Sequence, residues 1–172
     1  MLKVNCLEWS DVVENRRSIR KYKDTPVTDD QIIKILEAAR VAPSAMHKQP
    51  WHFIIVKDAE TRQKVAGGQG FASVAPVIIV ALGDSEASPS WWQNDVGIAF
   101  EHVMLAAANE GLGTCWMGST RRDAEIRKLL DIPERMKVVA ITPLGVPDEK
   151  PGLKQRKSLE EIVSWGRYGA KK

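Results

Sequence analysis

Residues 41–56 read V-A-P-S-A-M-H-K-Q-P-W-H-F-I-I-V. Upstream, apolar residues recur over 29–41 at roughly the period of an amphipathic helix. Pro43 ends that helix, because proline cannot continue the ladder of backbone hydrogen bonds and disfavours the helical conformation of the residue before it. Downstream, residues 53–56 are apolar and mostly β-branched, which predicts a buried strand. The polar loop between them is a candidate binding site, with an ordinary surface connection as the alternative.

The rest of the chain alternates between predicted helices and predicted strands. Helices are expected over residues 7–15, 59–66, 91–110 and 123–130, with a last short helix capped by Ser158, while Thr28 or Asp29 caps the helix over 29–41. Further strands are expected over 77–82, 114–117 and 136–144. No internal repeat divides the sequence, so one α/β or α+β domain over residues 1–172 is predicted around a small sheet. The second half of 91–110 is apolar nearly all round, which indicates a buried or interface helix.

The composition is that of an ordinary globular protein. The 172 residues are 44% hydrophobic and 27% charged, and this length suits one domain with a sizeable core. No apolar run approaches the length of a membrane span, and the first residues lack the layout of a signal peptide, so a cytoplasmic protein is expected. Cys6 and Cys115 lack metal-ligand spacing, and no set of His, Cys and carboxylate residues predicts a metal site.

Positive charge is concentrated in two short clusters. The first is Arg16-Arg17-Ser18-Ile19-Arg20-Lys21, and the second comprises Lys150, Lys154, Arg156 and Lys157. Guanidinium and ammonium groups beside a hydroxyl suit a phosphate, because arginine offers paired donors. For either cluster the alternative is a solvated basic surface. The net charge of +3 is too small to indicate nucleic-acid binding.

Three stretches together resemble the FMN-dependent nitroreductase family. They are R-R-S-I-R at 16–20, A-P-S-A-M-H-K-Q-P-W at 42–51 and G-L-G-T-C-W-M-G-S at 111–119, with K-P-x-x-K-x-R at 150–156 as a fourth match. Found in this order and at this spacing, they extend the resemblance over nearly the whole chain. The resemblance implies an α+β fold, a three-layer sandwich with a mixed central sheet flanked by helices, and a homodimer with two flavins at the subunit interface.

The resemblance also assigns roles to the basic clusters. The FMN phosphate and ribityl chain fall to Arg16, Arg17, Ser18, Lys154 and Arg156. Arg20 matches a position near the pyrimidine edge of the flavin, where a cation raises the reduction potential by stabilising the negative charge of the reduced form. Asp95 is a further candidate, expected to orient one of the basic groups.

Two other segments are implied to contact the flavin ring. Pro43, Ser44, Ala45 and His47 match a loop that comes from the other subunit, and Gln49 adds a polar donor to it. Met117, Gly118 and Ser119 match a strand end whose backbone N–H reaches flavin N5, where small residues permit close approach. The family usually has asparagine in place of His47. Imidazole is bulkier and titrates near neutrality, so flavin contact and substrate choice can differ here.

The implied activity is that of an NAD(P)H-dependent FMN oxidoreductase. Hydride passes from NADH or NADPH through flavin N5 to an electron-poor acceptor, such as a nitroaromatic or a quinone, in a ping-pong cycle. No catalytic side chain is named, because the flavin carries the chemistry and the protein supplies position and electrostatics. The alternatives are a specialised flavin dehydrogenase or dehalogenase of one metabolite and a flavin-binding module without turnover. Neither a nucleic acid nor a membrane is expected as a partner.

Overall fold

The computed structural model describes residues 8–172, so the predictions at Cys6 and Leu7 lie outside the described part. Its sheet runs in the order β1 (Trp51–Val56), β2 (Val77–Asp84), β5 (Met136–Gly145) and β3 (Gly113–Thr114), and β4 (Met117–Gly118) also pairs with β5. All four strand pairings are antiparallel. A parallel bridge joins Ser18 to Thr114 at the sheet edge, outside the named strands, so within residues 8–172 the sheet itself is antiparallel and not mixed as the resemblance implied.

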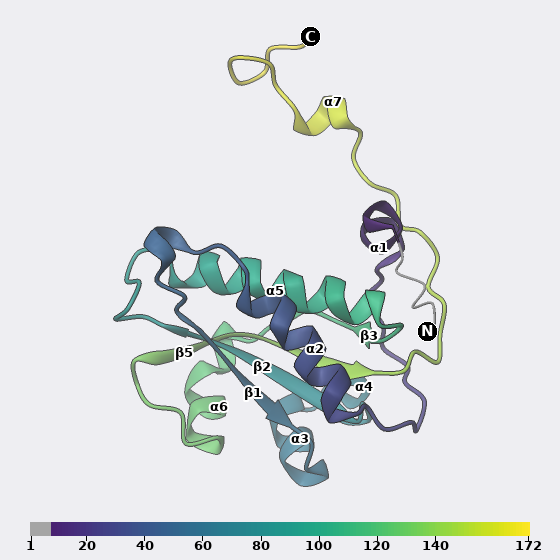
Figure 1. Cartoon of the computed structure of the whole chain (residues 1–172), viewed down its shortest axis with the longest axis vertical. Helices are drawn as coiled ribbons and strands as arrows, with labels where there is room; N and C mark the ends of the chain where they lie inside the picture. The colour runs from purple at the N-terminus through teal and green to yellow at the C-terminus, as the bar shows by residue number, and fades with distance from the viewer. Residues whose placement is uncertain (1–7) are drawn as a thin grey trace, which may run out of the picture.

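Helices cover both faces of this sheet (Figure 1). On one face lie α2 (Asp29–Arg40) and α5 (Trp92–Asn109), and on the other lie α3 (Ala59–Ala66), α4 (Gly70–Ser73) and α6 (Asp123–Leu129). The strand β2 is buried along nearly its whole length because alternate side chains enter two cores. Val77, Ile79 and Ala81 join the core beneath α2 and α5, while Ile78, Val80 and Leu82 join the opposite core. The result is the expected three-layer arrangement.

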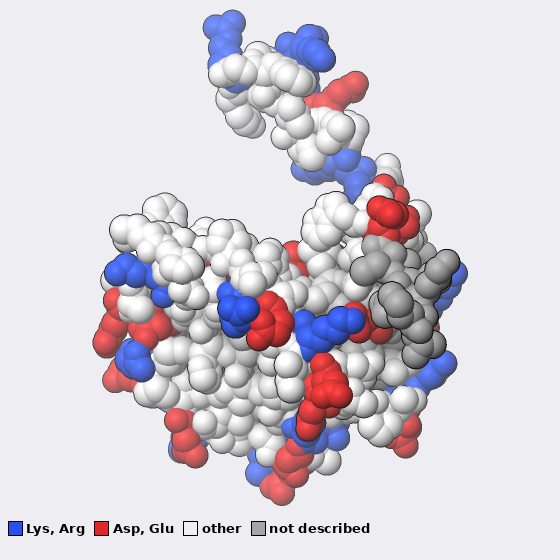
Figure 2. Space-filling view, viewed as in Figure 1, with Lys and Arg blue, Asp and Glu red and all other residues white. Residues whose placement is uncertain are grey.

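The C-terminal segment departs from the body of the molecule. Beyond Gly145 the chain passes α1 (Trp9–Asn15) and then extends outward through the short helix α7 (Leu159–Ile162) (Figure 1). Its apolar side chains are largely exposed, Leu159 by 75% and Trp165 by 54%. Figure 2 shows a broad hollow between this tail and the body, bordered largely by uncharged residues. No described helix is long and apolar enough to cross a membrane.

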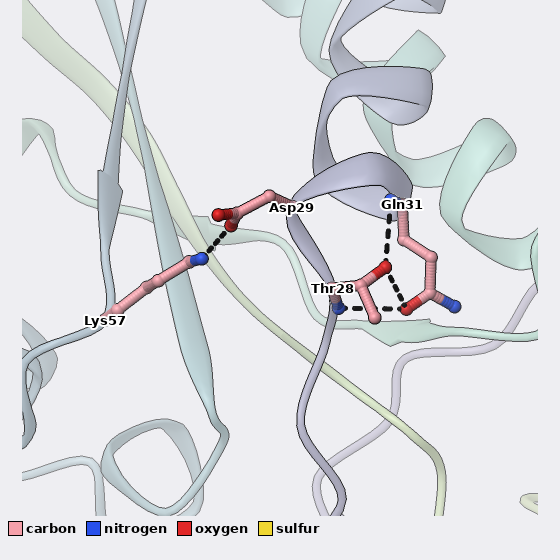
Figure 3. A network of polar contacts seen from close by, with 4 residues as sticks. All are labelled: Thr28, Asp29, Gln31 and Lys57. Carbon is pink, nitrogen blue, oxygen red and sulfur yellow. Dashed lines mark hydrogen bonds and ion pairs between the residues drawn. The ribbon is translucent and has the colours of Figure 1, made fainter.

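The helix before the polar loop begins at a well-formed cap (Figure 3). The Thr28 hydroxyl oxygen accepts a hydrogen bond from the backbone N–H of Gln31 at 3.2 Å, and the Gln31 side chain accepts one from the N–H of Thr28 at 3.0 Å. This reciprocal arrangement satisfies two N–H groups at the helix start. Asp29 instead forms an ion pair with Lys57, which follows β1. Thr28 is therefore the cap, and Asp29 ties the start of α2 to the end of the strand.

The structure differs from the predicted elements in three places. The strand expected over 114–117 is interrupted, because the N–H of Cys115 donates to the Thr142 hydroxyl at 3.0 Å instead of to a backbone carbonyl. The four-residue helix α4, which follows α3, was not predicted because it is too short to show a hydrophobic period. A 3₁₀ turn, η2 (Thr120–Arg122), precedes α6.

Candidate cofactor-binding site

The two basic clusters meet at one pocket. The pocket has a volume of about 550 Å³, and its lining includes Arg16, Arg17, Ser18, Arg20, Lys154 and Arg156. The first four residues follow α1, and the last two lie at the root of the C-terminal tail. Residues predicted separately from the two ends of the chain therefore share a single cationic site. A pocket of this kind suits a phosphate, because the guanidinium groups supply both charge and directed donors.

The N-terminal side of the pocket is held by α1 and α5. The Arg17 guanidinium donates to the carbonyls of Glu14 at 2.5 Å and of Arg16 at 2.9 Å, which satisfies carbonyls exposed at the end of α1. Arg16 Nε lies 3.6 Å from a Glu101 carboxylate oxygen on α5. Partial burial raises the pKa of Glu101, and the neighbouring Arg16 charge opposes that shift. Arg16 is thus oriented by α5 at the rim of the pocket.

The basic segment then runs along the sheet edge. The N–H of Ile19 donates to the Thr114 carbonyl at 2.8 Å. A Cβ on Gly113 would lie 2.8 Å from Ile19, so glycine permits this close crossing. One Glu149 carboxylate oxygen accepts the backbone N–H of Lys21 at 3.1 Å and also that of Arg20. Glu149 therefore fastens the segment to the loop that leads into Lys154 and Arg156, and sequence patterns gave no signal for this role.

The segment predicted to pass the flavin ring has one backbone donor on its outer side. Ser119 donates its N–H to the Val139 carbonyl at 3.3 Å, so the adjacent Gly118–Ala140 pair is non-hydrogen-bonded, and Gly118 directs its N–H away from β5. Among the described strands, β4 pairs with β5 alone. A Cβ on Gly118 would meet nothing within 4 Å. The open edge of β4 thus presents a backbone donor to a ligand.

The cationic pocket and this donor lie along the same edge of β5. Thr114, which bridges to Ser18, is opposite Leu144, and Gly118 is opposite Ala140. The two partner residues are four positions apart, which corresponds to about 13 Å along a strand. The edge therefore suits an elongated ligand with an anionic group at one end and a hydrogen-bonding ring at the other.

The polar loop of residues 43–49 lies elsewhere in the chain. It is at the end of α5 remote from α1 (Figure 1), and none of its residues lines the basic pocket. Its central turn, Ala45 to Lys48, is closed by a hydrogen bond of 3.1 Å and has positive φ at both Met46 and His47, the pattern of a type I′ turn. Gln49 also has a positive φ of 47°. Each such non-glycine residue costs about 1–2 kcal/mol, so the loop is strained.

The position of His47 explains why asparagine and histidine both fit there. Its φ of 57° is left-handed, a conformation in which asparagine and histidine are enriched among non-glycine residues. We expect His47→Gly to raise the free energy of unfolding by about 1 kcal/mol and His47→Val to lower it by about 1–2 kcal/mol. Urea denaturation measures both effects.

Lys48 is the matched control for this prediction. Its φ of −72° is ordinary right-handed backbone, so Lys48→Gly is expected to destabilise the protein by up to about 1 kcal/mol. Equal losses for glycine at positions 47 and 48 would contradict the assignment of strain to His47.

Asp95 does not have the role predicted for it. Its carboxylate accepts the backbone N–H of Ala45 at 3.0 Å and the hydroxyl of Ser88 at 3.3 Å. Neither contact involves a basic group, because Asp95 begins α5 beside the polar loop rather than beside the basic pocket. Within residues 8–172, no group of three His, Cys, Asp or Glu side chains is placed to hold a metal.

Comparison with known proteins settles the family. A family model described as the nitroreductase family matches residues 13–67 and 63–146. The chain belongs to the nitroreductase family. This membership confirms the relationship predicted from the four sequence stretches and the α+β fold that it implied.

Three relatives of the family illustrate its range. A protein of Methanothermobacter thermautotrophicus, predicted to be an NADH dehydrogenase/NAD(P)H nitroreductase, is 39% identical over 87% of this chain and 83% of its own length. The solved structure of an NADPH:FMN oxidoreductase from Vibrio harveyi, complexed with NAD+, has a TM-score of 0.86 at 28% identity, covering 95% of this chain and 79% of that one. An iodotyrosine deiodinase of Thermotoga neapolitana is 26% identical over 81% of this chain and 88% of its own.

Proposed function

We propose that this member of the nitroreductase family binds FMN in the basic pocket and along the edge of β5, and uses NAD(P)H to reduce an electron-poor acceptor. The enzyme class and the cofactor predicted from the sequence are confirmed by the names of its relatives, which include NAD(P)H nitroreductases, FMN reductases and flavin oxidoreductases. The chemistry that FMN supplies when bound is hydride exchange, from NAD(P)H to flavin N5 and then to the acceptor, in a ping-pong cycle.

The observation that carries the proposal is the convergence of both basic clusters on one pocket. Five cationic side chains and the Ser18 hydroxyl line it, which fits the dianionic phosphate of FMN. About 13 Å further along β5, Gly118 offers the outward N–H that suits a ring nitrogen. The donor set therefore fits the cofactor at both ends.

The residues of the chain then have distinct tasks. Arg16, Arg17, Ser18, Lys154 and Arg156 bind the phosphate end. Arg20 lines the same pocket, and its guanidinium carbon lies 5.9 Å from the centre of the Phe71 ring on α4. The open space on the Cβ side of Gly118 leaves room for a ring to approach the backbone.

We further propose that the working form is a homodimer. In a single chain the loop of residues 43–49 is remote from the pocket (Figure 1), so it reaches a flavin only from a second subunit. The surface around α1, α2 and α5 also has an apolar hollow of about 490 Å³, lined by Trp9, Val12, Val41, Leu105 and other residues. With the exposed apolar tail, this surface is what a subunit interface buries.

Steady-state kinetics test the function. Purified protein with FMN is expected to oxidise NADH or NADPH when a nitroaromatic or a quinone is present. A ping-pong cycle predicts parallel double-reciprocal plots when both substrates are varied. Intersecting plots would contradict the ping-pong cycle.

A reductive dehalogenase is the second candidate, because an iodotyrosine deiodinase is among the relatives. Release of iodide from iodotyrosine by the reduced enzyme, together with no turnover of quinones or nitroaromatics, would favour it over the general reductase.

A further inference from the structure

The loop of residues 44–49 combines backbone strain with unusually firm attachment. Three of its residues, Met46, His47 and Gln49, have positive φ. Its most prominent side chain, Met46, is 81% exposed, so burial of its own apolar groups does not hold the loop in this conformation. Such strain persists only where surrounding contacts over-determine the backbone, and it is concentrated at functional sites.

The loop closes on itself and is tied to the sheet. The Ser44 hydroxyl oxygen accepts the backbone N–H of Gln49 at 2.9 Å, and the Ser44 carbonyl accepts that of His47 at 3.0 Å. At the end of the loop, the Pro50 carbonyl accepts the N–H of Asp84 at 2.8 Å. These bonds set the shape of the loop and fix its exit to the end of β2.

Asp95 holds the start of the loop. Its carboxylate is 4% exposed and accepts the N–H of Ala45 and the Ser88 hydroxyl through different oxygens. Asp95 is the fourth residue of α5, and the hydrogen bonds described for its carboxylate go to the loop and to Ser88 rather than to the helix's own first N–H groups. The positive end of the helix favours a carboxylate there. The buried charge is therefore used to attach the loop rather than to cap the helix.

We propose that Asp95 is a positioning residue that holds the strained loop in the shape with which it completes the flavin site of the second subunit. The inference rests on the proposed function, because the loop acts on the reaction only if it covers the bound ring. Asp95 acts on the substrates indirectly, through the position of Ala45 and of the loop residues that follow it. Displacement of such a positioning element by about 1 Å can lower a rate about 100-fold.

The test compares Asp95→Ala with Asp95→Asn. Asparagine keeps a carbonyl oxygen for the N–H of Ala45 and an amide group for Ser88. Alanine removes both of the oxygen atoms that accept these hydrogen bonds. Val65→Ala is the control for general destabilisation, because Val65 is fully buried in the opposite core. Each variant is assayed for kcat and KM, bound FMN, and the rate of trypsin cleavage after Lys48, identified by mass spectrometry.

We expect Asp95→Ala to be cleaved after Lys48 about tenfold faster than the parent, since it loses a hydrogen bond to a charged group. Its kcat/KM for NAD(P)H should fall about 100-fold, while FMN remains bound through the basic pocket. Asp95→Asn should stay within about threefold of the parent in both assays, and Val65→Ala should lower thermal stability without faster cleavage at Lys48.

Two results would overturn the inference. One is equal cleavage at Lys48 in Asp95→Ala and Val65→Ala, and the other is unchanged kcat/KM in Asp95→Ala despite faster cleavage. Failure of the proposed function looks different. In that case the parent protein neither binds FMN nor oxidises NAD(P)H, and the cleavage assay still decides whether Asp95 holds the loop.

Discussion

Replacing Arg156 or Arg16 by alanine is expected to weaken FMN binding by about 10- to 100-fold in each case, and more in the double variant. Each guanidinium offers charge-assisted hydrogen bonds worth about 1.5–3 kcal/mol to a phosphate. Both line the pocket where the two basic clusters meet. The purified variants should contain little FMN and remain dimeric, which fluorescence titration with FMN and size-exclusion chromatography measure.

Lys157→Ala is the matched control, because Lys157 adjoins Arg156 and is exposed outside the pocket lining. It removes the same charge and should leave FMN affinity unchanged. Stoichiometric flavin in both arginine variants would contradict the phosphate assignment. An equal loss in Lys157→Ala would assign the effect to net charge instead.

Replacing Phe100 by alanine is expected to lower the free energy of unfolding by about 3–5 kcal/mol. The side chain is fully buried on α5. Its ring centre lies 6.3 Å from that of Phe53 on β1 and 4.9 Å from that of Trp116, between β3 and β4. Its removal leaves a cavity between the sheet, α5 and the segment that joins β3 to β4.

Urea denaturation at equal protein concentration measures this loss, since the proposed dimer would make apparent stability depend on concentration. Val74→Ala provides the control, because Val74 is 66% exposed before β2, and its loss should stay below about 1 kcal/mol. A loss of less than about 1 kcal/mol for Phe100→Ala would contradict the packing of this aromatic group.

Local sequence patterns were sufficient for the longer helices and the long strands. The helix over 59–66 has the predicted bounds, because Asp58 accepts the N–H of Thr61 as a helix cap and Gly67 adopts the left-handed conformation that ends helices. Residues 77–82 form the central strand because their alternation of apolar side chains serves both cores. The strand extends two residues further, to Asp84.

The parts that were missed depend on contacts distant in sequence. Glu149 binds the N–H of Lys21 across 128 positions, and Asp95 binds that of Ala45 across 50. A carboxylate that receives backbone donors over such distances has no local signature. The left-handed loop was equally hidden, because Met46, His47 and Gln49 are not the glycines that usually mark this conformation.

The site was predicted from several separate stretches of the sequence, and the structure brings together some of them but not all. Arg16 and Arg156 were identified from clustered charge and resemblance, and they share one pocket. The loop of Ser44 and His47 was identified as a candidate binding site from its polar residues and was assigned to the flavin ring by resemblance, and neither residue lines that pocket in one chain. Their contact with flavin therefore remains a prediction that depends on a second subunit.

The visible absorption spectrum of the purified protein, recorded without oxygen before and after NADH or NADPH is added, tests the central claim most directly. The account predicts flavin absorption bands that bleach with at least one of the two nucleotides. A colourless protein that takes up no added FMN, or flavin bands that neither nucleotide bleaches, would contradict it.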